Sequence, residues 1–373
     1  MSAKNKKKDA LYWLYNLPKD SIDSIIKEVD STLIKIGYEI TAFVVTSDFD
    51  IFETLDTRFI KNFELEKKKL GDNIFSYKLS KKLRGKKEKR RSKFLIFKHI
   101  KPKIYILLTH EKFIIIRDDI ISLLRRFYPF ISRTFINSNF LKEILQSLDK
   151  ELKDLNIRVS QYSTQSRITD KLATKTYETD VKYTDISYKK MFEKAEENDE
   201  WIRSVYLSLI EPEKRTHIAS NNMICQISRH GYIKCNKKFE FFYNTIIKEV
   251  IEKSSNNIEF FQNRQRIKKE NYKPKPLIIQ YNIDLFKDRN QNKRLINVLE
   301  KITFSSLSII HSNPYLHSIY VDYKDGSSYD IWILSSNEIT IVPQMRSTYA
   351  SLEKLIHHIF IGLREGTIID YTV

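Results

Sequence analysis

The sequence predicts an α+β protein built from three related units, each a curved antiparallel sheet backed by helices. The main observation is the order strand, helix, three strands, helix between residues 276 and 363. Two earlier stretches share the strand–turn–strand–helix end of that order. Their turn hydroxyls, Thr109 and Ser228, precede Ser335 at intervals of roughly 110 residues, which gives each unit enough chain. Chance is the alternative, because this order of elements is common in α+β proteins.

The C-terminal unit has the clearest signals. It begins with an apolar run that continues as alternating apolar and polar residues, a pattern typical of a half-buried strand. Asp325–Gly326 predicts a tight turn, because this pair tolerates the positive φ of short hairpins. The expected elements are a strand within 276–286, a helix around 295–302, strands at 318–323, 329–334 and 339–342, and a helix around 352–360.

The two earlier units are assigned in the same way. After a helix at 22–36, the first unit has expected strands at 38–45, 94–97, 104–108 and 113–116, helices at 52–63 and 119–128, and a basic insertion at 67–93. The second unit follows a connecting helix at 141–155, and has expected helices at 188–198 and 239–251 and strands at 202–210, 223–227 and 232–235.

These patterns divide the chain into four parts. Residues 1–37 form a basic tail and an N-terminal helix, and 38–150 form repeat one with its insertion. Residues 151–275 form repeat two and a polar linker, and 276–373 form repeat three. Prolines 274 and 276 mark the end of the linker.

The charge favours a polyanionic partner. The chain of 373 residues carries 65 Lys+Arg against 47 Asp+Glu, a net charge of +18. Nucleic acid is the most common partner for a charge of this size. A genome biased toward Lys, Asn and Ile codons is the alternative source. The 21 Tyr and 22 Phe favour packed cores over general disorder.

The two cysteines and the hydropathy pattern favour a reducing, intracellular compartment. Cys225 and Cys235 are expected on neighbouring strands of one hairpin, and one pair makes neither a zinc site nor a disulfide framework. No apolar window has the length of a membrane span, and no signal peptide follows Lys4–Lys8. The cytoplasm or the nucleus, including that of a virus-infected cell, fits these features.

Several sequence strings resemble repeats of the TATA-box-binding protein family. The strings Leu95-Ile96-Phe97-Lys98, Lys101-Pro102-Lys103-Ile104 and Tyr128-Pro129 are similar to a series in the second repeat of that family. The stretch from Asn313-Pro314 to Ser335-Ser336 is similar to one in its first repeat. The lysine-rich chain also looks like viral transcription initiation factors, including the poxvirus intermediate transcription factor.

The resemblance implies a fold and a mode of binding. In that family each repeat is a strand, a helix, further strands and a long helix, and two repeats form a saddle whose concave sheet lies on the DNA minor groove. Phenylalanines inserted between base steps kink the DNA. Here those positions fall on His317 and Leu334 in the third copy and on about Ser92 and Thr109 in the first. Asp322 is expected on a strand that faces the DNA, where its carboxylate would be repelled.

Three repeats are an odd number for a saddle made of two halves. Copies two and three are joined by a linker long enough to let them pair, which leaves copy one with an open sheet edge. We therefore expect a second protein subunit to cover that edge, with a homodimer as the nearest competitor. RNA polymerase is a further candidate partner.

The expected DNA contacts come from the basic tract and from the lysines after it. Neutralising phosphates releases counterions, which favours binding by dense cationic segments. A solvated loop or a nuclear address is the alternative for the tract, and an exposed sheet face for the later lysines. The candidate nucleic-acid-binding residues are Lys81, Lys82, Arg84, Lys86, Lys87, Lys89, Arg90, Arg91, Lys93, Lys98, Lys101 and Lys103.

The sequence favours a non-enzymatic protein without a metal or cofactor. It shows no arrangement typical of nucleophilic catalysis, and its 7 glycines form no phosphate-binding loop. Asp48, Asp50 and Glu53 suggest a nuclease metal site only as a third interpretation. Trp201 and Trp332 are interpreted as packing residues. The leading hypothesis is a double-stranded DNA-binding subunit of a transcription initiation factor, and the alternative is a protein-binding scaffold of a viral or defence complex.

Overall fold

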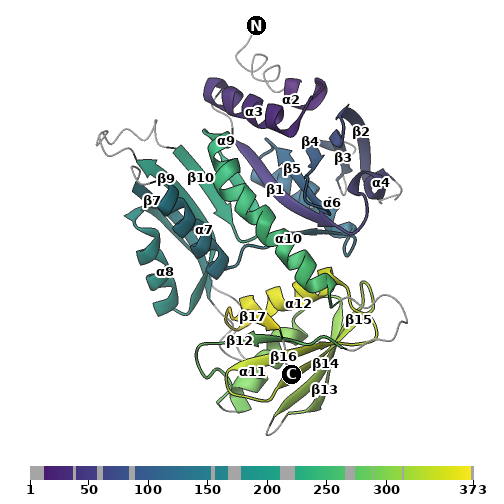
Figure 1. Ribbon diagram of the computed structural model, residues 1–373, viewed down its shortest axis with the longest axis vertical. Coiled ribbons are helices and arrows are strands. Elements are labelled where there is room, and N and C mark those ends of the chain that lie inside the picture. Colours follow the sequence, from purple (N-terminus) through teal and green to yellow (C-terminus); the bar gives the residue numbers. More distant parts are fainter. Residues whose placement is uncertain are drawn as a thin grey trace.

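The computed structural model describes residues 12–36, 39–56, 62–83, 89–152, 156–166, 178–210, 223–264, 274–287, 289–312 and 315–370. These residues form two antiparallel sheets with helices packed on them (Figure 1), so the predicted α+β class is confirmed. The larger sheet has 11 strands and the C-terminal sheet has 6.

The larger sheet has the strand order β2-β3-β4-β5-β1-β11-β10-β9-β7-β8, and β6 also pairs with β1. Its strand pairs within the described residues are antiparallel. Its strands are β1 (Ile40–Ser47), β2 (Phe63–Gly71), β3 (Ile74–Lys82), β4 (Lys89–Lys98), β5 (Ile104–Thr109), β6 (Ile131–Arg133), β7 (Asn156–Ser166), β8 (Glu178–Ile186), β9 (Glu200–Ile210), β10 (Met223–Ser228) and β11 (Tyr232–Cys235).

The C-terminal sheet has the order β13-β14-β15-β16-β12-β17. Its strands are β12 (Leu277–Gln280), β13 (Ser305–His311), β14 (Leu316–Asp322), β15 (Ser327–Ile333), β16 (Glu338–Pro343) and β17 (Thr367–Asp370). The helices α11 (Arg289–Glu300) and α12 (Tyr349–Gly362) pack on one of its faces through residues such as Leu295 and Leu355. The expected antiparallel sheet with two helices is therefore confirmed, and β13 and β17 are additional strands that the sequence patterns missed.

Two stretches of the chain share one topology. In each, a strand is followed by a helix, a four-stranded meander, helical turns, and a last strand that pairs with the first strand. One stretch runs from β1 to β6 and the other from β12 to β17. The middle stretch, 156–262, has a different strand order and shares only the ending β10, turn, β11, helix.

The β1–β5 half of the larger sheet has helices on both faces. Phe43 and Val45 of β1 face α4 (Ile51–Asp56) and the helical run α5 (Phe113–Ile115), η1 (Ile116–Ile121) and α6 (Ser122–Arg126). Ala42 and Val44 face the other way, into a core shared with the remaining helices. Those helices are α2 (Tyr12–Asn16), α3 (Ile22–Ile36), α7 (Ser138–Glu151), α8 (Tyr188–Glu197), α9 (Phe239–Phe242), η2 (Tyr243–Ile247) and α10 (Lys248–Gln262).

The seam between repeats differs from the expected one. β1 pairs with β11 from Ile40↔Cys235 to Phe43↔Tyr232, so the first and second copies share a sheet, and not the second and third. The segment 113–116 begins a helix instead of forming a strand, because Ile116 and Ile120 point into the core beneath the sheet. Thr109 therefore ends the strand before the helix, whereas Ser335 precedes one more strand, and the two hydroxyls are not equivalent.

A buried ion pair joins the C-terminal unit to the larger sheet. Glu365 accepts hydrogen bonds from the backbone N–H groups of Ser138 (2.8 Å) and Asn139 (2.9 Å), at the start of α7. Its carboxylate lies 3.5 Å from Nη1 of Arg229, and the Arg229 side chain is fully buried. The guanidinium of Arg229 also lies 3.9 Å from the ring centre of Trp201. Glu365, in the segment between α12 and β17, thus binds both the N-terminus of α7 and the side chain of Arg229.

Removal of this carboxylate should be costly. We expect Glu365→Ala to lower the free energy of unfolding by about 3–5 kcal/mol, because Arg229 would stay buried without its counter-charge. Urea unfolding followed by circular dichroism measures the change. Glu300→Ala, at the end of α11, is the control and should change the stability by less than about 0.5 kcal/mol. Equal effects of both substitutions would contradict the role of the pair.

A second buried carboxyl at the same joint predicts a pH dependence. Glu353 of α12 accepts a hydrogen bond from the Ser132 hydroxyl of β6 (3.3 Å). Burial raises the pKa of Glu353 to about 7, while this hydrogen bond partly opposes the shift. The folded protein therefore keeps a proton that the unfolded chain releases near pH 4.5, so this group makes the fold less stable as the pH rises from about 4.5 to 7.

We expect Glu353→Gln to remove that loss, because the amide stays neutral. At pH 8 the free energy of unfolding of the variant should exceed that of the wild type by about 1–2 kcal/mol, and near pH 4.5 the two should be equal. This is less than the full pKa shift of Glu353 would give, because part of its side chain reaches solvent. Urea unfolding of both proteins across this pH range is the measurement. A difference that does not change with pH would contradict the assignment.

Candidate nucleic-acid interface

The basic tract forms strands instead of an insertion. β2 and β3 pair from Phe63↔Lys81 to Gly71↔Ile74, and β3 and β4 pair from Ile74↔Phe97 to Lys82↔Lys89. The expected insertion at 67–93 is therefore wrong. The apolar residues Leu79 and Phe94 explain the strands, because they alternate with the cations and pack beneath α4 and α6.

The candidate cations fall into three groups. Five of them make ion pairs with acids of this chain: Lys81, Lys89, Arg90, Lys101 and Lys103. Three others, Arg84, Lys86 and Lys87, lie outside the described residues. The remaining four, Lys82, Arg91, Lys93 and Lys98, make no ion pair with any acid in the described ranges.

Asp119 is the main structural partner of the tract. It is fully buried in η1 and accepts hydrogen bonds from Nε (2.6 Å) and Nη2 of Arg90, and Nζ of Lys81 lies 3.4 Å away. The hydrogen bonds to Asp119 raise the pKa of Arg90. Arg90 and Lys81 therefore neutralise a buried carboxylate and stabilise the fold.

Three of the four free cations share one sheet face. The register pairs Lys78 with Lys93, Ser80 with Arg91, and Lys82 with Lys89, so these residues point to the same side. Glu66 and Glu64 lie on that side too and pair with Lys78 (2.8 Å) and Lys89 (2.5 Å). The acids leave Lys82, Arg91 and Lys93 as the free charges of this face, which we call the cationic face.

The later lysines occupy a turn. Lys98 ends β4 and Ile104 begins β5, so Lys101 and Lys103 lie between the strands and not on the shared strand face expected for them. Nζ of Lys101 lies 3.0 Å from Glu252 of α10, and Nζ of Lys103 lies 3.0 Å from Asp48. Both lysines connect the turn to neighbouring elements.

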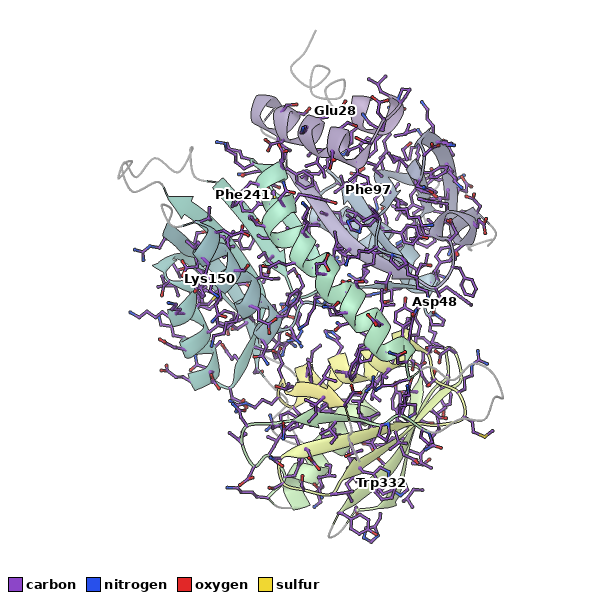
Figure 2. The ribbon with its side chains drawn as sticks, in the orientation of Figure 1. Glu28, Asp48, Phe97, Lys150, Phe241 and Trp332 are labelled. Carbon is purple, nitrogen blue, oxygen red and sulfur yellow. The ribbon has the colours of Figure 1, made fainter. Side chains whose placement is uncertain are left out.

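A second surface lies on the C-terminal sheet, opposite α11 and α12. Side chains of β14 and β15 alternate between buried and half-exposed, and the half-exposed ones include His317, Ile319, Asp330 and Trp332. No helix covers this face in the part of the chain that the structure describes. We call it the open face. Figure 2 marks its position by Trp332, at the end of the molecule remote from Glu28.

Aromatic rings stand in a row on the open face. His317 stacks on Trp332 with ring centres 3.6 Å apart and an angle of 9°. Tyr315 lies 6.3 Å from Trp332 and 4.4 Å from His311. Leu334, directly after β15, is 64% exposed. The row combines planar, apolar and titratable groups on a surface accessible to a large partner.

The sequence patterns missed part of this surface. Trp332 was interpreted as a packing residue, but Tyr329, Ile331 and Ile333 fill the buried side and leave Trp332 outside. That alternation was the available signal. Asp322 shows the reverse error, because it is fully buried toward α12 and binds Lys354 (2.8 Å) and Tyr128 (3.1 Å) instead of facing outward.

In the first copy, the positions that correspond to His317 and Leu334 are buried. Ser92 is 1% exposed and Thr109 is 0% exposed, so neither is available for a wedge between base pairs. On the opposite face, β1, β5 and the end of β4 are covered as well, because Leu95 and Leu108 pack into the core that includes α2, α3 and α10. The exposed part of this side is the cationic face on β2–β4.

The suggested metal site is used for structure. Asp50 accepts hydrogen bonds from the backbone N–H groups of Phe52 (2.8 Å) and Glu53 (3.3 Å) and so caps α4, and Asp48 binds Lys103. Among the described residues, no group of three or more His, Cys, Asp or Glu side chains is arranged to hold a metal ion.

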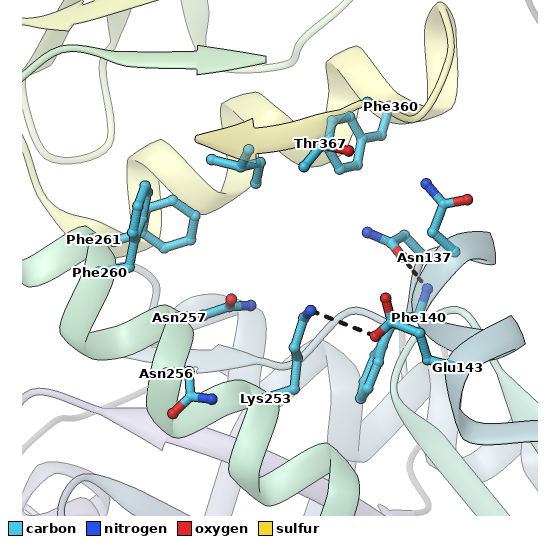
Figure 3. Close-up of a pocket in the computed structure, with 13 residues that line it drawn as sticks. Asn137, Phe140, Glu143, Lys253, Asn256, Asn257, Phe260, Phe261, Phe360 and Thr367 are labelled. Carbon is cyan, nitrogen blue, oxygen red and sulfur yellow. Dashed lines mark hydrogen bonds and ion pairs between the residues drawn. The ribbon is translucent and has the colours of Figure 1, made fainter. Parts of the chain in front are cut away.

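A cavity of about 320 Å³ lies where α7, α10, α12 and β17 meet (Figure 3). Its walls carry Asn256 and Asn257 on one side and Asn137 on the other, and Lys253 lies 3.7 Å from Glu143 across it. Phe140, Phe261 and Phe360 provide its apolar surface. It contains no pair of groups placed for acid–base chemistry, so it is a gap between packed units.

No protein family matches this sequence, and no curated protein matches it. Within the described ranges, no helix combines the length and the apolar character needed to cross a membrane.

The two groups of cations should respond differently to substitution. We expect Asp119→Ala to lower the free energy of unfolding by about 3–5 kcal/mol, because Arg90 and Lys81 lose a buried partner. The combined change Lys82→Ala, Arg91→Ala and Lys93→Ala should stay within about 0.5 kcal/mol per residue, as usual for exposed sites. Urea unfolding at constant ionic strength compares them. A large loss in the triple variant would show that these cations also stabilise the fold.

Proposed function

We propose that the protein is a DNA-binding subunit of a transcription initiation factor that contacts double-stranded DNA through the open face of its C-terminal sheet. The observation that carries this proposal is the location of His317 and Leu334. The resemblance to TATA-box-binding-protein repeats puts the DNA-kinking positions at these two residues. Both lie on or beside the face of the C-terminal sheet that lies opposite α11 and α12.

The order of elements supports the proposal. A strand, a helix, further strands and a long helix make up a repeat of the resembled family, and β12, α11, β13–β16 and α12 follow that order. β1 to α6 follows it too. Burial of Asp322 removes a negative charge from the proposed DNA surface.

The chemistry of the open face fits a minor-groove partner. Proteins that bind this groove insert apolar side chains between base steps and bend the duplex. Leu334 is an exposed apolar wedge, and the flat ring of Trp332 beside it offers a stacking surface. The cations of the cationic face would add phosphate contacts and a dependence on salt.

Duplex binding by two matched variants tests the proposal. Leu334→Ser should weaken binding of a 30-base-pair A·T-rich duplex by about tenfold and reduce the bend measured by energy transfer, because the wedge is lost. Met345→Ser, which removes another exposed apolar side chain, is the control. Equal affinities and equal bend angles for the wild type and Leu334→Ser would contradict the wedge.

The charge contribution is measured separately. The logarithm of the affinity falls linearly with the logarithm of the salt concentration. The triple variant Lys82→Ala, Arg91→Ala and Lys93→Ala should make this slope shallower by about 2–3, because fewer counterions are released. The matched control removes three exposed lysines of α8: Lys189, Lys190 and Lys194. If both variants lower the slope equally, the cationic face has no special role.

A protein-binding scaffold is the second candidate. It is favoured by the helices α2, α3 and α10, which cover the face of β1–β5 that a saddle would turn to DNA. The sheet edge at β1, which a second subunit was expected to cover, is paired with β11. A second subunit would therefore have to contact another surface, and so would RNA polymerase. Absence of duplex binding even at low salt would favour the scaffold.

A further inference from the structure

The edge strands of the two sheets differ in how they discourage pairing with other chains. Natural proteins protect exposed edges with charges, short strands or bulges. β2 carries Glu64, Glu66 and Lys67–Lys69. β8 carries Glu178, Asp180 and Lys182. β17 has only four residues and ends at Asp370. Three of the four edges are therefore protected.

β13 lacks this protection. Its seven residues, Ser-Ser-Leu-Ser-Ile-Ile-His, contain no Lys, Arg, Asp, Glu, Gly or Pro. Ile309 is 46% exposed and Ile310 is 57% exposed. A bulge between Ile309 and His311 distorts only the end of the strand, and Ser305–Ile309 keeps regular pairing with β14. A regular, uncharged edge of this kind is a template for another strand.

We propose that β13 pairs antiparallel with β13 of a second copy of this chain, around a twofold axis at Leu307. The proposal goes beyond the proposed function, because it needs no nucleic acid. Charge compatibility selects a second copy as the occupant. An antiparallel strand facing its own copy puts the residue on the axis opposite itself and its neighbours opposite one another, and β13 has no Lys, Arg, Asp or Glu that would be brought together in this way.

The pairing would be favourable on both faces of the sheet. With the axis at Leu307, Ser306 of one copy faces Ser308 of the other on the open-face side, a hydroxyl pair that stabilises sheets. The two Leu307 side chains meet on the helix side, where Leu307 already packs against the core. The open faces of the two copies would join into one sheet of 12 strands, two times the 6 of one copy.

The native mass of the purified full-length chain tests this directly. Sedimentation equilibrium at 1–100 μM should give a dimer of twice 44.5 kDa. Each copy has a net charge of +18, so added salt should strengthen the dimer, in contrast to its expected effect on DNA binding. This opposite dependence separates failure of the dimer from failure of the proposed function.

A charge-swap pair tests the register. Ser306→Lys with Ser308→Lys puts lysines opposite each other twice across the axis and should raise the dimer dissociation constant by at least about tenfold. The matched variant Ser306→Lys with Ser308→Glu puts opposite charges there and should remain dimeric. Both changes are on solvent-facing positions, and circular dichroism checks that the fold is kept. A wild-type monomer at 100 μM, or equal dissociation constants for the two variants, would overturn the proposal.

Discussion

The arrangement of this protein depends on the buried carboxylate of Glu365. It neutralises Arg229, caps α7 and fixes the connection that leads from α12 into β17. An ionised pair is removed from water only where hydrogen bonds and opposite charge compensate the desolvation. The turn of β10–β11, the start of α7 and the C-terminal unit are therefore held in one relative position, and that position decides which surfaces stay open.

The second constraint is the placement of helices on the larger sheet. β1, β5 and the C-terminal half of β4 are covered on one face by α4 and α6 and on the other by α2, α3 and α10, so their side chains are apolar on both faces. This is the pattern of a doubly covered sheet. The C-terminal sheet has helices on one side only and shows clean alternation. The C-terminal sheet thus keeps one open face, whereas β1 and β5 keep none, although both stretches share one topology.

The sequence supported some parts of this picture better than others. The strands and helices from β14 to α12 were predicted close to their observed limits, because alternation and helical spacing were both strong. The segment 113–116 was assigned wrongly, since four consecutive apolar residues fit a buried strand or a buried helix equally well. The basic tract was assigned as an insertion because its cations masked the alternating Tyr77 and Leu79 that pack in the core.

By itself, the sequence determined the α+β class, the meander of the C-terminal unit and the number of cations, because these follow from local periodicity and composition. Only the tertiary structure decided which cations are free. Arg90 and Lys81 meet Asp119 across two strands and a helix, and Lys101 meets Glu252 of α10, contacts that no spacing along the chain encodes. It likewise decided that Trp332 faces outward while Asp322 is buried, because burial depends on which side of a sheet the helices cover.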